Sequence, residues 1–296
     1  MNKIIFSLLA TLLITNLTFA TSSQNIHISN EIHKIEKQHG GKVGVYTINR
    51  NNWHNFTHSE TFYFPICSVY KFLVVGAILK ESMTDSNLLD EKVRISKNQI
   101  IGYSPITKKY VGKEITVKEL CKASILSDNT ATNLLIYKLG GLKKLGAFIL
   151  SLKDHATKIT ALEPKINDVN LKNNLNKTTP KIIARDLNKI AFSHDVLDKK
   201  HRILFKKWLK ENNTGSNRIA AELPKGWKIG DKTGTCDYGS TNDVAIVWPN
   251  DSRAIVISIL YTQPLKNAKP NDKVIQEVAK ILFDNFHTKK IDKKDA

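Results

Sequence analysis

The sequence of 296 residues lacks internal repeats and low-complexity tracts, and it contains only 3 cysteines, 14 glycines and 8 prolines. Its hydrophobic content of 41% and charged content of 24% are those of an ordinary globular protein. This composition excludes a fibrous or intrinsically disordered chain. After the first 20 residues, no apolar run is long enough to cross a bilayer, so we expect no membrane anchor.

Acidic residues are scarce: 27 Asp and Glu stand against 45 Lys and Arg, which gives a formal net charge of +18. Such a balance favours attraction to anionic surfaces or solutes. The lysines are scattered, however, and no zinc-finger or helix-turn-helix pattern is present, so a solvated surface is favoured over nucleic-acid binding. The 9 histidines are dispersed and lack a His-x-His-x-Asp arrangement, so we predict no metal and no cofactor.

Residues 1–20 have the pattern of a secretory signal peptide. A lysine at position 3 precedes the apolar run from Ile4 to Leu13, and small residues stand at Thr18 and Ala20. We predict cleavage after Ala20 and a periplasmic or secreted protein. A membrane anchor is the alternative, for which the run is short and interrupted by polar residues.

Strand patterns occur at both ends of the chain and helical patterns in the middle. We expect helices at 25–40 and 272–286, and strands at 43–48, 227–236, 243–248 and 254–262. This order predicts an α/β (α+β) fold. One discontinuous domain, residues 21–65 and 211–290, would hold an antiparallel sheet with flanking helices; 66–210 would form an inserted all-helical domain, and 291–296 a charged tail. A cleft between the two domains is the natural place for a site.

Ser68 and Lys71 stand at the start of an apolar run that follows Pro65 and is suited to a buried helix. Residues three apart share one face of a helix, so the Lys71 amine can reach the Ser68 hydroxyl. A desolvated lysine can be neutral enough to take the serine proton and make it a nucleophile. A chance pair in a Lys-rich chain is the alternative, and this pair alone does not decide between them.

Two further polar motifs follow, Ser-Asp-Asn at 127–129 and Lys-Thr-Gly-Thr at 232–235. The first precedes a helical run, where the same residues are good helix N-caps, and capping is the better interpretation of this motif alone. The second lies on a predicted strand, where Gly234 would let a ligand approach the backbone closely. An exposed strand with a glycine bulge is the alternative.

Together, these three motifs in this order resemble the penicillin-recognising serine enzymes, namely β-lactamases and cell-wall transpeptidases and carboxypeptidases. A fourth motif, Glu-Pro-Lys-Ile-Asn at 163–167, resembles the omega-loop signature of class A β-lactamases. There, a glutamate and an asparagine hold the water that hydrolyses the acyl-enzyme, a step that needs a base. The resemblance covers essentially the whole mature chain and implies the β-lactamase/transpeptidase-like fold.

By position, the resemblance implies catalytic roles for Ser68 as nucleophile, Lys71 as assisting amine, Ser127 as proton relay and Glu163 as hydrolytic base. It implies substrate binding by Tyr103, Asn129, Asn167, Arg218, Lys232, Thr233 and Thr235. The backbone N–H groups of Ser68 and Thr235 would form the oxyanion hole. Whether Lys71 or Glu163, through water, activates the serine is left open.

The cysteines indicate a subgroup. Cys67 precedes the nucleophile and Cys236 follows the Lys-Thr-Gly-Thr motif, a pair that resembles the active-site disulfide of class A carbapenemases. Export favours its oxidation, whereas three buried thiols are the alternative. Cys121 would remain a buried free thiol.

The sequence also departs from most class A enzymes. An arginine and an aspartate that pair across the omega loop are replaced by Ala161 and Asn176, so we expect a less firmly held loop and altered deacylation of bulky cephalosporins. The segment after Cys236 looks short for a carbapenemase, which places carbapenem turnover in question.

We therefore predict a class A serine β-lactamase that gives antibiotic resistance, acts on small-molecule β-lactams and is a monomer. A DD-peptidase, which lacks the hydrolytic base, and a penicillin sensor domain, which needs a tether or partner domain, are the competing interpretations.

Overall fold

The computed structural model describes residues 24–52, 55–250 and 252–291, with the side chains beyond 286 excepted. The predicted signal peptide and residues 292–296 of the predicted tail lie outside this range.

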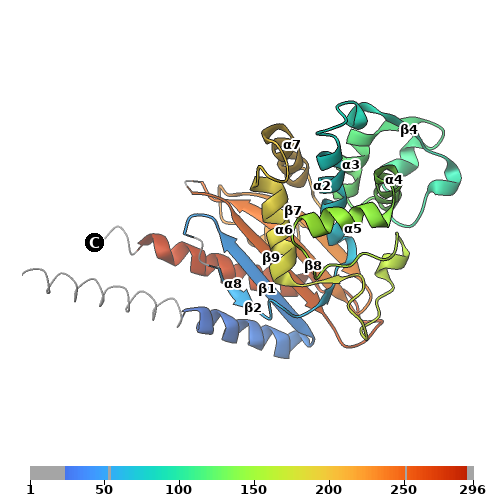
Figure 1. Ribbon diagram of the computed structural model, residues 1–296. Helices are drawn as coiled ribbons and strands as arrows, with labels where there is room; N and C mark the ends of the chain where they lie inside the picture. Colours follow the sequence, from blue (N-terminus) through green and yellow to red (C-terminus); the bar gives the residue numbers. More distant parts are fainter. Residues whose placement is uncertain (1–23, 53–54, 251, 292–296) are drawn as a thin grey trace, which may run out of the picture.

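The centre of the fold is a five-stranded antiparallel sheet of order β2-β1-β9-β8-β7 (Figure 1). Its strands are β1 (Lys42–Asn49), β2 (Thr57–His58), β7 (Lys228–Cys236), β8 (Ser240–Trp248) and β9 (Ile255–Thr262). Segments from both ends of the chain thus form the antiparallel sheet that the sequence predicts.

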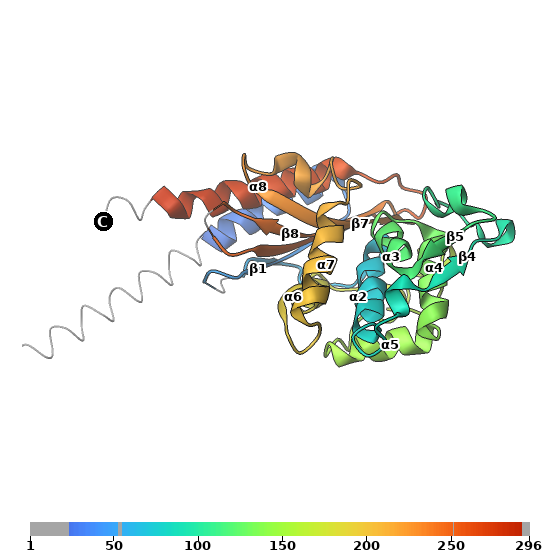
Figure 2. The same cartoon turned by 90° about the horizontal axis from the view of Figure 1, so that it is seen from above.

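Both faces of the sheet are buried, because apolar residues occupy successive positions that point to opposite sides. On β8, Ala245 and Val247 pack against the helix at 24–39 and α8 (Asp272–Ile291). The alternate residues Val244 and Ile246 belong to the other apolar core, which continues into the helical part. Figure 2 shows α8 and the first helix on one face of the sheet and α6 (Pro180–Phe192) on the other.

The inserted part is mainly helical. Its elements are η1 (Cys67–Tyr70), α2 (Lys71–Glu81), α3 (Val117–Ile125), α4 (Asn129–Leu139), α5 (Leu142–Ser151), α6 and α7 (Lys199–Lys210). Nine of the eleven residues of α2 are buried, which makes it the central helix. The insert, expected to be all-helical, also contains the short hairpin β4 (Lys92–Arg94) and β5 (Glu114–Thr116). A further small ladder joins β3 (Phe64–Pro65) to β6 (Lys177–Thr178).

Two features of the fold place functional groups together. Strand β7 is the edge of the sheet nearest the helical part, and η1 packs directly against it. The loop between α5 and β6, residues 152–176, returns across the same region. Within the described chain, none of the helices combines the length and apolar character that crossing a bilayer requires.

Candidate active site

Ser68 lies in the tight 3-10 turn η1, immediately before α2, and is partly exposed. The preceding Cys67 has a left-handed backbone with φ of +46°, a conformation that non-glycine residues adopt mainly where the surroundings impose it. A Cβ at Gly234 on β7 would come within 3.1 Å of the Ser68 backbone nitrogen and of Ile66 O. The absence of a side chain at Gly234 therefore leaves room for the close approach of the strand to the serine turn.

The regular pairing of Gly234 with Asn242 excludes the glycine bulge that was the alternative for this motif. The disulfide between Cys67 and Cys236 joins the serine turn to the end of β7, as the resemblance implies. The third cysteine, Cys121, is a buried free thiol. Burial raises the pKa of this thiol, so it stays protonated and unreactive.

Lys71 is completely buried at the start of α2, and its ammonium group has three oxygen partners. Nζ donates to the Ser127 carbonyl at 2.9 Å and to Asn129 Oδ1 at 2.5 Å, and it lies 3.0 Å from Glu163 Oε1. Burial lowers the pKa of Lys71, and the Glu163 charge opposes this shift. In the described chain no hydrogen bond joins Lys71 Nζ to Ser68 Oγ; the partners of this amine are Ser127, Asn129 and Glu163.

Glu163 is buried and points inward. Its Oε2 accepts a 2.7 Å hydrogen bond from Asn167 Nδ2, and the Tyr70 hydroxyl lies 3.5 Å from Oε1. Burial and then the Glu163 charge raise the pKa of Tyr70 well above its usual value, so Tyr70 remains a neutral donor. The backbone of Glu163 is held by the Asn133 side chain, which donates to its carbonyl at 2.9 Å and accepts from its N–H at 3.0 Å.

Asn176 closes the neck of the loop that carries Glu163. Its N–H donates to Lys158 O at 2.8 Å, its Oδ1 accepts from Thr160 N at 2.8 Å, and its carbonyl accepts from Ile66 N at 3.0 Å. Its φ of +53° lies in the left-handed region that asparagine tolerates. Ala161 is half-buried against the core. Hydrogen bonds of Asn176 thus join the two ends of this loop, in place of the arginine–aspartate ion pair that the sequence lacks.

Asp128 caps α4 and anchors the Ser-Asp-Asn motif. Its carboxylate accepts from Ala131 N at 2.8 Å, from Ile106 N at 2.9 Å, and from Thr107 N at 2.8 Å. The capping interpretation therefore applies to Asp128. Its neighbour Ser127, with φ of +68°, turns the chain so that its carbonyl meets Lys71 and its hydroxyl meets Lys232.

Lys232 is the second fully buried amine of the site. Its Nζ donates to Ser127 Oγ and, at 2.8 Å, to the Thr233 carbonyl. Burial and then the positive charge of Lys71 lower the pKa of Lys232 to about 7, although the Asp231 charge acts in the opposite direction. A small change in its surroundings can therefore change the charge that this amine presents near neutral pH.

Arg218 lies behind strand β7. Its Nε pairs with Asp272 Oδ1 at 2.7 Å, Nη1 donates to the Gly234 and Asn242 carbonyls, and Nη2 donates to Thr235 Oγ1 at 2.7 Å. The guanidinium therefore adds positive charge beneath the outer end of the strand and orients the Thr235 hydroxyl.

These groups surround a pocket of about 300 Å³. It is lined by Ser68, Tyr103, Ser127, Asn129, Asn167, Thr233, Gly234 and Thr235. Tyr103 stands at the rim with 61% of its surface exposed. Lys71 and Glu163 lie buried beneath the lining residues, and Arg218 lies behind them. The structure thus brings every predicted site residue to one pocket or to its immediate support.

The turn after Cys236 consists of three residues, 237–239, before β8 begins. The Tyr238 N–H donates to Lys266 O at 2.9 Å, and its carbonyl accepts from Gln263 N at 2.8 Å. This side of the pocket is therefore tied to the chain that follows β9.

Sequence reasoning missed several supporting residues. Asn133 lies four positions after Asn129, hence on the same face of α4, and this spacing could have identified it. Asp231 and Asp243 form a buried pair behind Lys232, and burial raises the pKa of both carboxyl groups. Their pairing across β7 and β8 needs the strand register, which the sequence alone does not reveal.

The serine turn, the buried Lys71, the Ser127 turn and Lys232 on the edge strand meet at one pocket, an arrangement typical of the class of penicillin-recognising serine enzymes. Comparison with known proteins is more specific. The family model described as the beta-lactamase enzyme family matches residues 27–286. A β-lactamase of Citrobacter koseri is 36% identical over 267 residues, which cover 90% of either chain.

Among solved structures, a β-lactamase from Francisella tularensis has a TM-score of 0.86 and 48% identity, covering 88% of this chain and 99% of that chain. One from Burkholderia phymatum has a TM-score of 0.85 and 37% identity, covering 88% and 98%. The chain belongs to the β-lactamase enzyme family, with the class A resemblance and the predicted disulfide both confirmed. Its activity is the hydrolysis of β-lactams, which gives resistance to these antibiotics.

Proposed function

We propose that this enzyme opens β-lactams through an ester on Ser68 and that Glu163 delivers the water that hydrolyses this ester. The inward-facing Glu163 carboxylate carries the proposal. It is buried, lies 3.0 Å from Lys71 Nζ and accepts a hydrogen bond from Asn167 at the floor of the pocket. A solvent-facing Glu163 would have favoured a penicillin target that cannot hydrolyse its acyl-enzyme.

Acylation begins when Ser68 Oγ attacks the lactam carbonyl. The proton of Oγ passes to Lys71, if its amine is neutral, or to Glu163 through a water; burial, which disfavours the ammonium, supports the first route, and the adjacent carboxylate supports the second. The backbone N–H groups of Ser68 and Thr235 would stabilise the developing oxyanion. Ser127, in contact with Lys232, then returns a proton to the departing lactam nitrogen.

Substrate binding would use residues that line the pocket, together with the buried Lys232. The substrate carboxylate would be bound by Lys232, Thr233 and Thr235, with the charge of Arg218 beneath. The Thr235 hydroxyl accepts from Arg218, so its own proton is available to the ligand. Asn129 and Asn167 would bind the acyl-amide side chain, and Tyr103 would form the outer wall.

Deacylation needs a base that activates the water attacking the ester. Glu163 would accept a proton from a water held by Asn167 and direct the resulting hydroxide to the ester carbonyl. Its backbone clamp to Asn133 and its carboxylate contacts keep this base in one position, which favours the water-mediated step.

The test follows the covalent intermediate. Wild type, Glu163→Ala and the matched control Glu114→Gln, at an exposed position, are mixed with nitrocefin and then with imipenem. We expect steady-state turnover of nitrocefin by wild type and control, and an accumulated acyl adduct on Ser68, seen by mass spectrometry, in Glu163→Ala alone. Full turnover by Glu163→Ala would refute the role of this base. The imipenem rates measure whether the short turn after Cys236 permits carbapenem hydrolysis.

We further propose that the enzyme acts outside the cytoplasm as a monomer, after signal-peptide cleavage near Ala20. The disulfide supports export, because such bonds persist in oxidising compartments. The division into a discontinuous α/β domain, 21–65 with 211–290, and a domain at 66–210 stays a prediction.

A further inference from the structure

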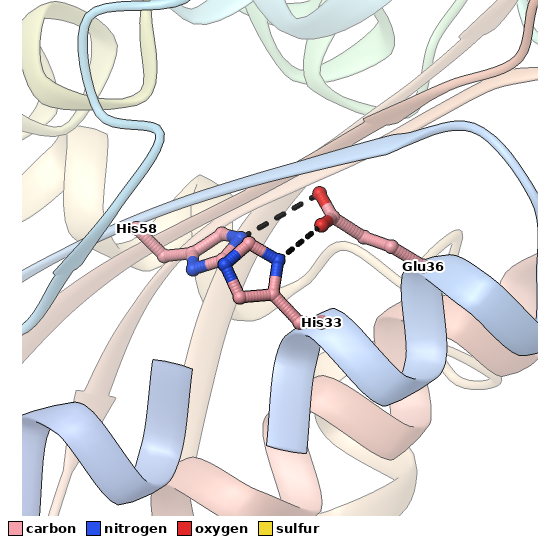
Figure 3. Close-up of side chains that lie close together, drawn as sticks. All are labelled: His33, Glu36 and His58. Atoms are coloured by element: carbon pink, nitrogen blue, oxygen red, sulfur yellow. Dashed lines mark hydrogen bonds and ion pairs between the residues drawn. The ribbon is translucent and has the colours of Figure 1, made fainter. Parts of the chain in front are cut away.

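We propose that His33, Glu36 and His58 form a binding site for a divalent transition-metal ion, best suited to Zn²⁺. One ligand atom from each of the three residues lies within 4.8 Å of the other two. Figure 3 shows the two imidazole rings and the carboxylate converging from the first helix and from β2. The sequence predicts no metal site, because its histidines are dispersed and lack a His-x-His-x-Asp arrangement.

Two of the three distances between donor atoms are close to those of a zinc site. His33 Nδ1 lies 2.8 Å from Glu36 Oε2, and His58 Nε2 lies 3.5 Å from Glu36 Oε1. Ligands of a tetrahedral Zn²⁺ with bonds of about 2.0–2.1 Å are about 3.3 Å apart. The His33 side chain is 52% exposed and can move outward to admit the ion.

His58 provides the observation that points to a ligand. Only 5% of the surface of His58 is exposed, and its Nε2 atom is buried without a hydrogen-bond partner. The other ring nitrogen, Nδ1, lies 2.8 Å from Ser29 Oγ. When Nδ1–H donates to the Ser29 hydroxyl, the Nε2 lone pair is directed toward Glu36. A hydrogen bond of this kind, made by the ring nitrogen that does not bind the metal, orients metal-binding histidines.

Glu36 supplies the anionic ligand. Its Oε1 accepts a 2.8 Å hydrogen bond from Val43 N, which fixes the carboxylate, and Lys42 Nζ lies 3.6 Å away. The ammonium group of the half-exposed Lys42 neutralises Glu36 in the absence of a metal ion. The Lys42 side chain would have to turn away when the metal binds.

Two imidazoles and one carboxylate suit Zn²⁺ and neighbouring transition metals better than Mg²⁺ or Ca²⁺, which prefer oxygen ligands. A water would complete the tetrahedron on the exposed side, beside His33. The metal would join the first helix to β2, an edge strand of only two residues. Because β2 and β7 are opposite edges of the sheet, this ion would stabilise the fold and take no part in β-lactam hydrolysis.

The experiment uses the enzyme without a polyhistidine tag, stripped with EDTA and titrated with ZnCl₂ or MgCl₂. Affinity is measured by competition with a chromophoric chelator, and stability by the melting temperature. We expect one Zn²⁺ per chain, a saturable rise in melting temperature with Zn²⁺ alone, and unchanged nitrocefin turnover. His33→Gln and Glu36→Gln should each lose at least about tenfold in affinity. Lys42→Ala should bind Zn²⁺ more tightly.

Matched controls identify the site. His194→Gln, at an exposed histidine on another surface, should bind as wild type does. His39→Gln alters the His39–Glu277 pair, in which Nε2 and Oε2 are 2.8 Å apart, and should also leave affinity unchanged. Equal affinity in wild type and His33→Gln, or a loss confined to His39→Gln, would overturn the proposal.

Discussion

The two buried amines of the pocket differ in what balances their charge. Lys71 lies 3.0 Å from the Glu163 carboxylate, whereas Lys232 has the Ser127 hydroxyl and a carbonyl as its direct acceptors. Behind Lys232, the buried carboxyl groups of Asp231 and Asp243 have raised pKa values, which reduces the negative charge available to it. The pKa of Lys232, lowered to about 7, therefore makes its charge sensitive to pH near neutrality.

The pKa of about 7 at Lys232 predicts an alkaline limb in the pH profile of kcat/KM. Above this pH the free enzyme loses the charge that we propose binds the substrate carboxylate, so KM should rise. Lys232→Arg keeps its charge and should shift this limb to higher pH. Profiles between about pH 5 and pH 9 for a penicillin test this, with Lys228→Arg on the exposed start of the same strand as control. Coincident alkaline limbs in wild type and Lys232→Arg would contradict it.

A second buried carboxyl pair predicts how stability depends on pH. Asp154 and Asp186 each leave Oδ2 without a hydrogen-bond donor, and a proton on Asp186 shared with Asp154 would satisfy both. Burial, and then the charge of Asp154, raises the pKa of Asp186 well above its usual value. In the unfolded chain Asp186 ionises at about pH 4. Above that pH the native state therefore binds one proton more than the unfolded state does. The free energy of unfolding should therefore fall as pH rises toward the native pKa, by roughly 1 kcal/mol per pH unit.

Asp186→Asn removes this titration while keeping a donor for Asp154. Its stability relative to wild type should increase from about pH 5 to pH 8, as measured by urea unfolding. The exposed Asp195→Asn should track wild type throughout. A constant difference between Asp186→Asn and wild type at all pH values would show that the proton is not held there.

At the scale of single residues, the sequence identifies the residues of the site better than it predicts the contacts between them. Ser68, Lys71 and Lys232 stand in recognisable motifs, so the pocket lining could be predicted. The Lys71–Glu163 ion pair could not, because the two residues are 92 positions apart and meet only after the loop folds back. For the same reason the approach of His58 Nε2 to Glu36 has no signature in the sequence.

Among the elements, the loop that carries Glu163 is held at its neck by a side-chain amide. Asn176→Ala removes the Oδ1 acceptor of Thr160 and places alanine at a positive φ, so the loop should loosen. We expect a loss of about 1–3 kcal/mol in stability and slower deacylation, most of all for bulky cephalosporins. Single-turnover kinetics measure the second effect.

Asn176→Asp is the matched variant, because it keeps the acceptor and tolerates the left-handed backbone. It should deacylate nearly as wild type does. Equal deacylation by Asn176→Ala and wild type would mean that the clamp between Asn133 and Glu163 suffices to hold the base.

The elements that the sequence predicts best are those with apolar periodicity. The predicted strand 254–262 agrees with β9, and 227–236 with β7. Strand β8 begins at Ser240, three residues before the prediction, because its first residues are buried polar side chains that hide the apolar pattern. The hairpin β4–β5 was missed for a related reason, since its three-residue strands are too short to show a period.

For the molecule as a whole, the disulfide closes a loop of 169 residues that contains the entire helical part. In the chain-entropy model such a bond contributes about 4–5 kcal/mol. Cys67→Ser should lower the melting temperature by roughly 10 °C, measured by calorimetry.

Two further variants separate the bond from the individual side chains. Cys236→Ser and the double variant should be destabilised as much as Cys67→Ser, because one bond is lost in each. Cys121→Ala removes a buried thiol that is not in the bond and should cost about 1 kcal/mol. Additive losses in the double variant would argue against a bridge.

The first and last helices of the described chain lie side by side on the face of the sheet turned away from the helical part, joined by a 3.1 Å hydrogen bond from Gln24 to Asn285 (Figure 1). A short linker could therefore connect them, and the chain could be reopened at an exposed surface loop, giving a circular permutant with the same pocket. Fusion of a reporter domain at this shared end would likewise leave the entrance for antibiotics unobstructed.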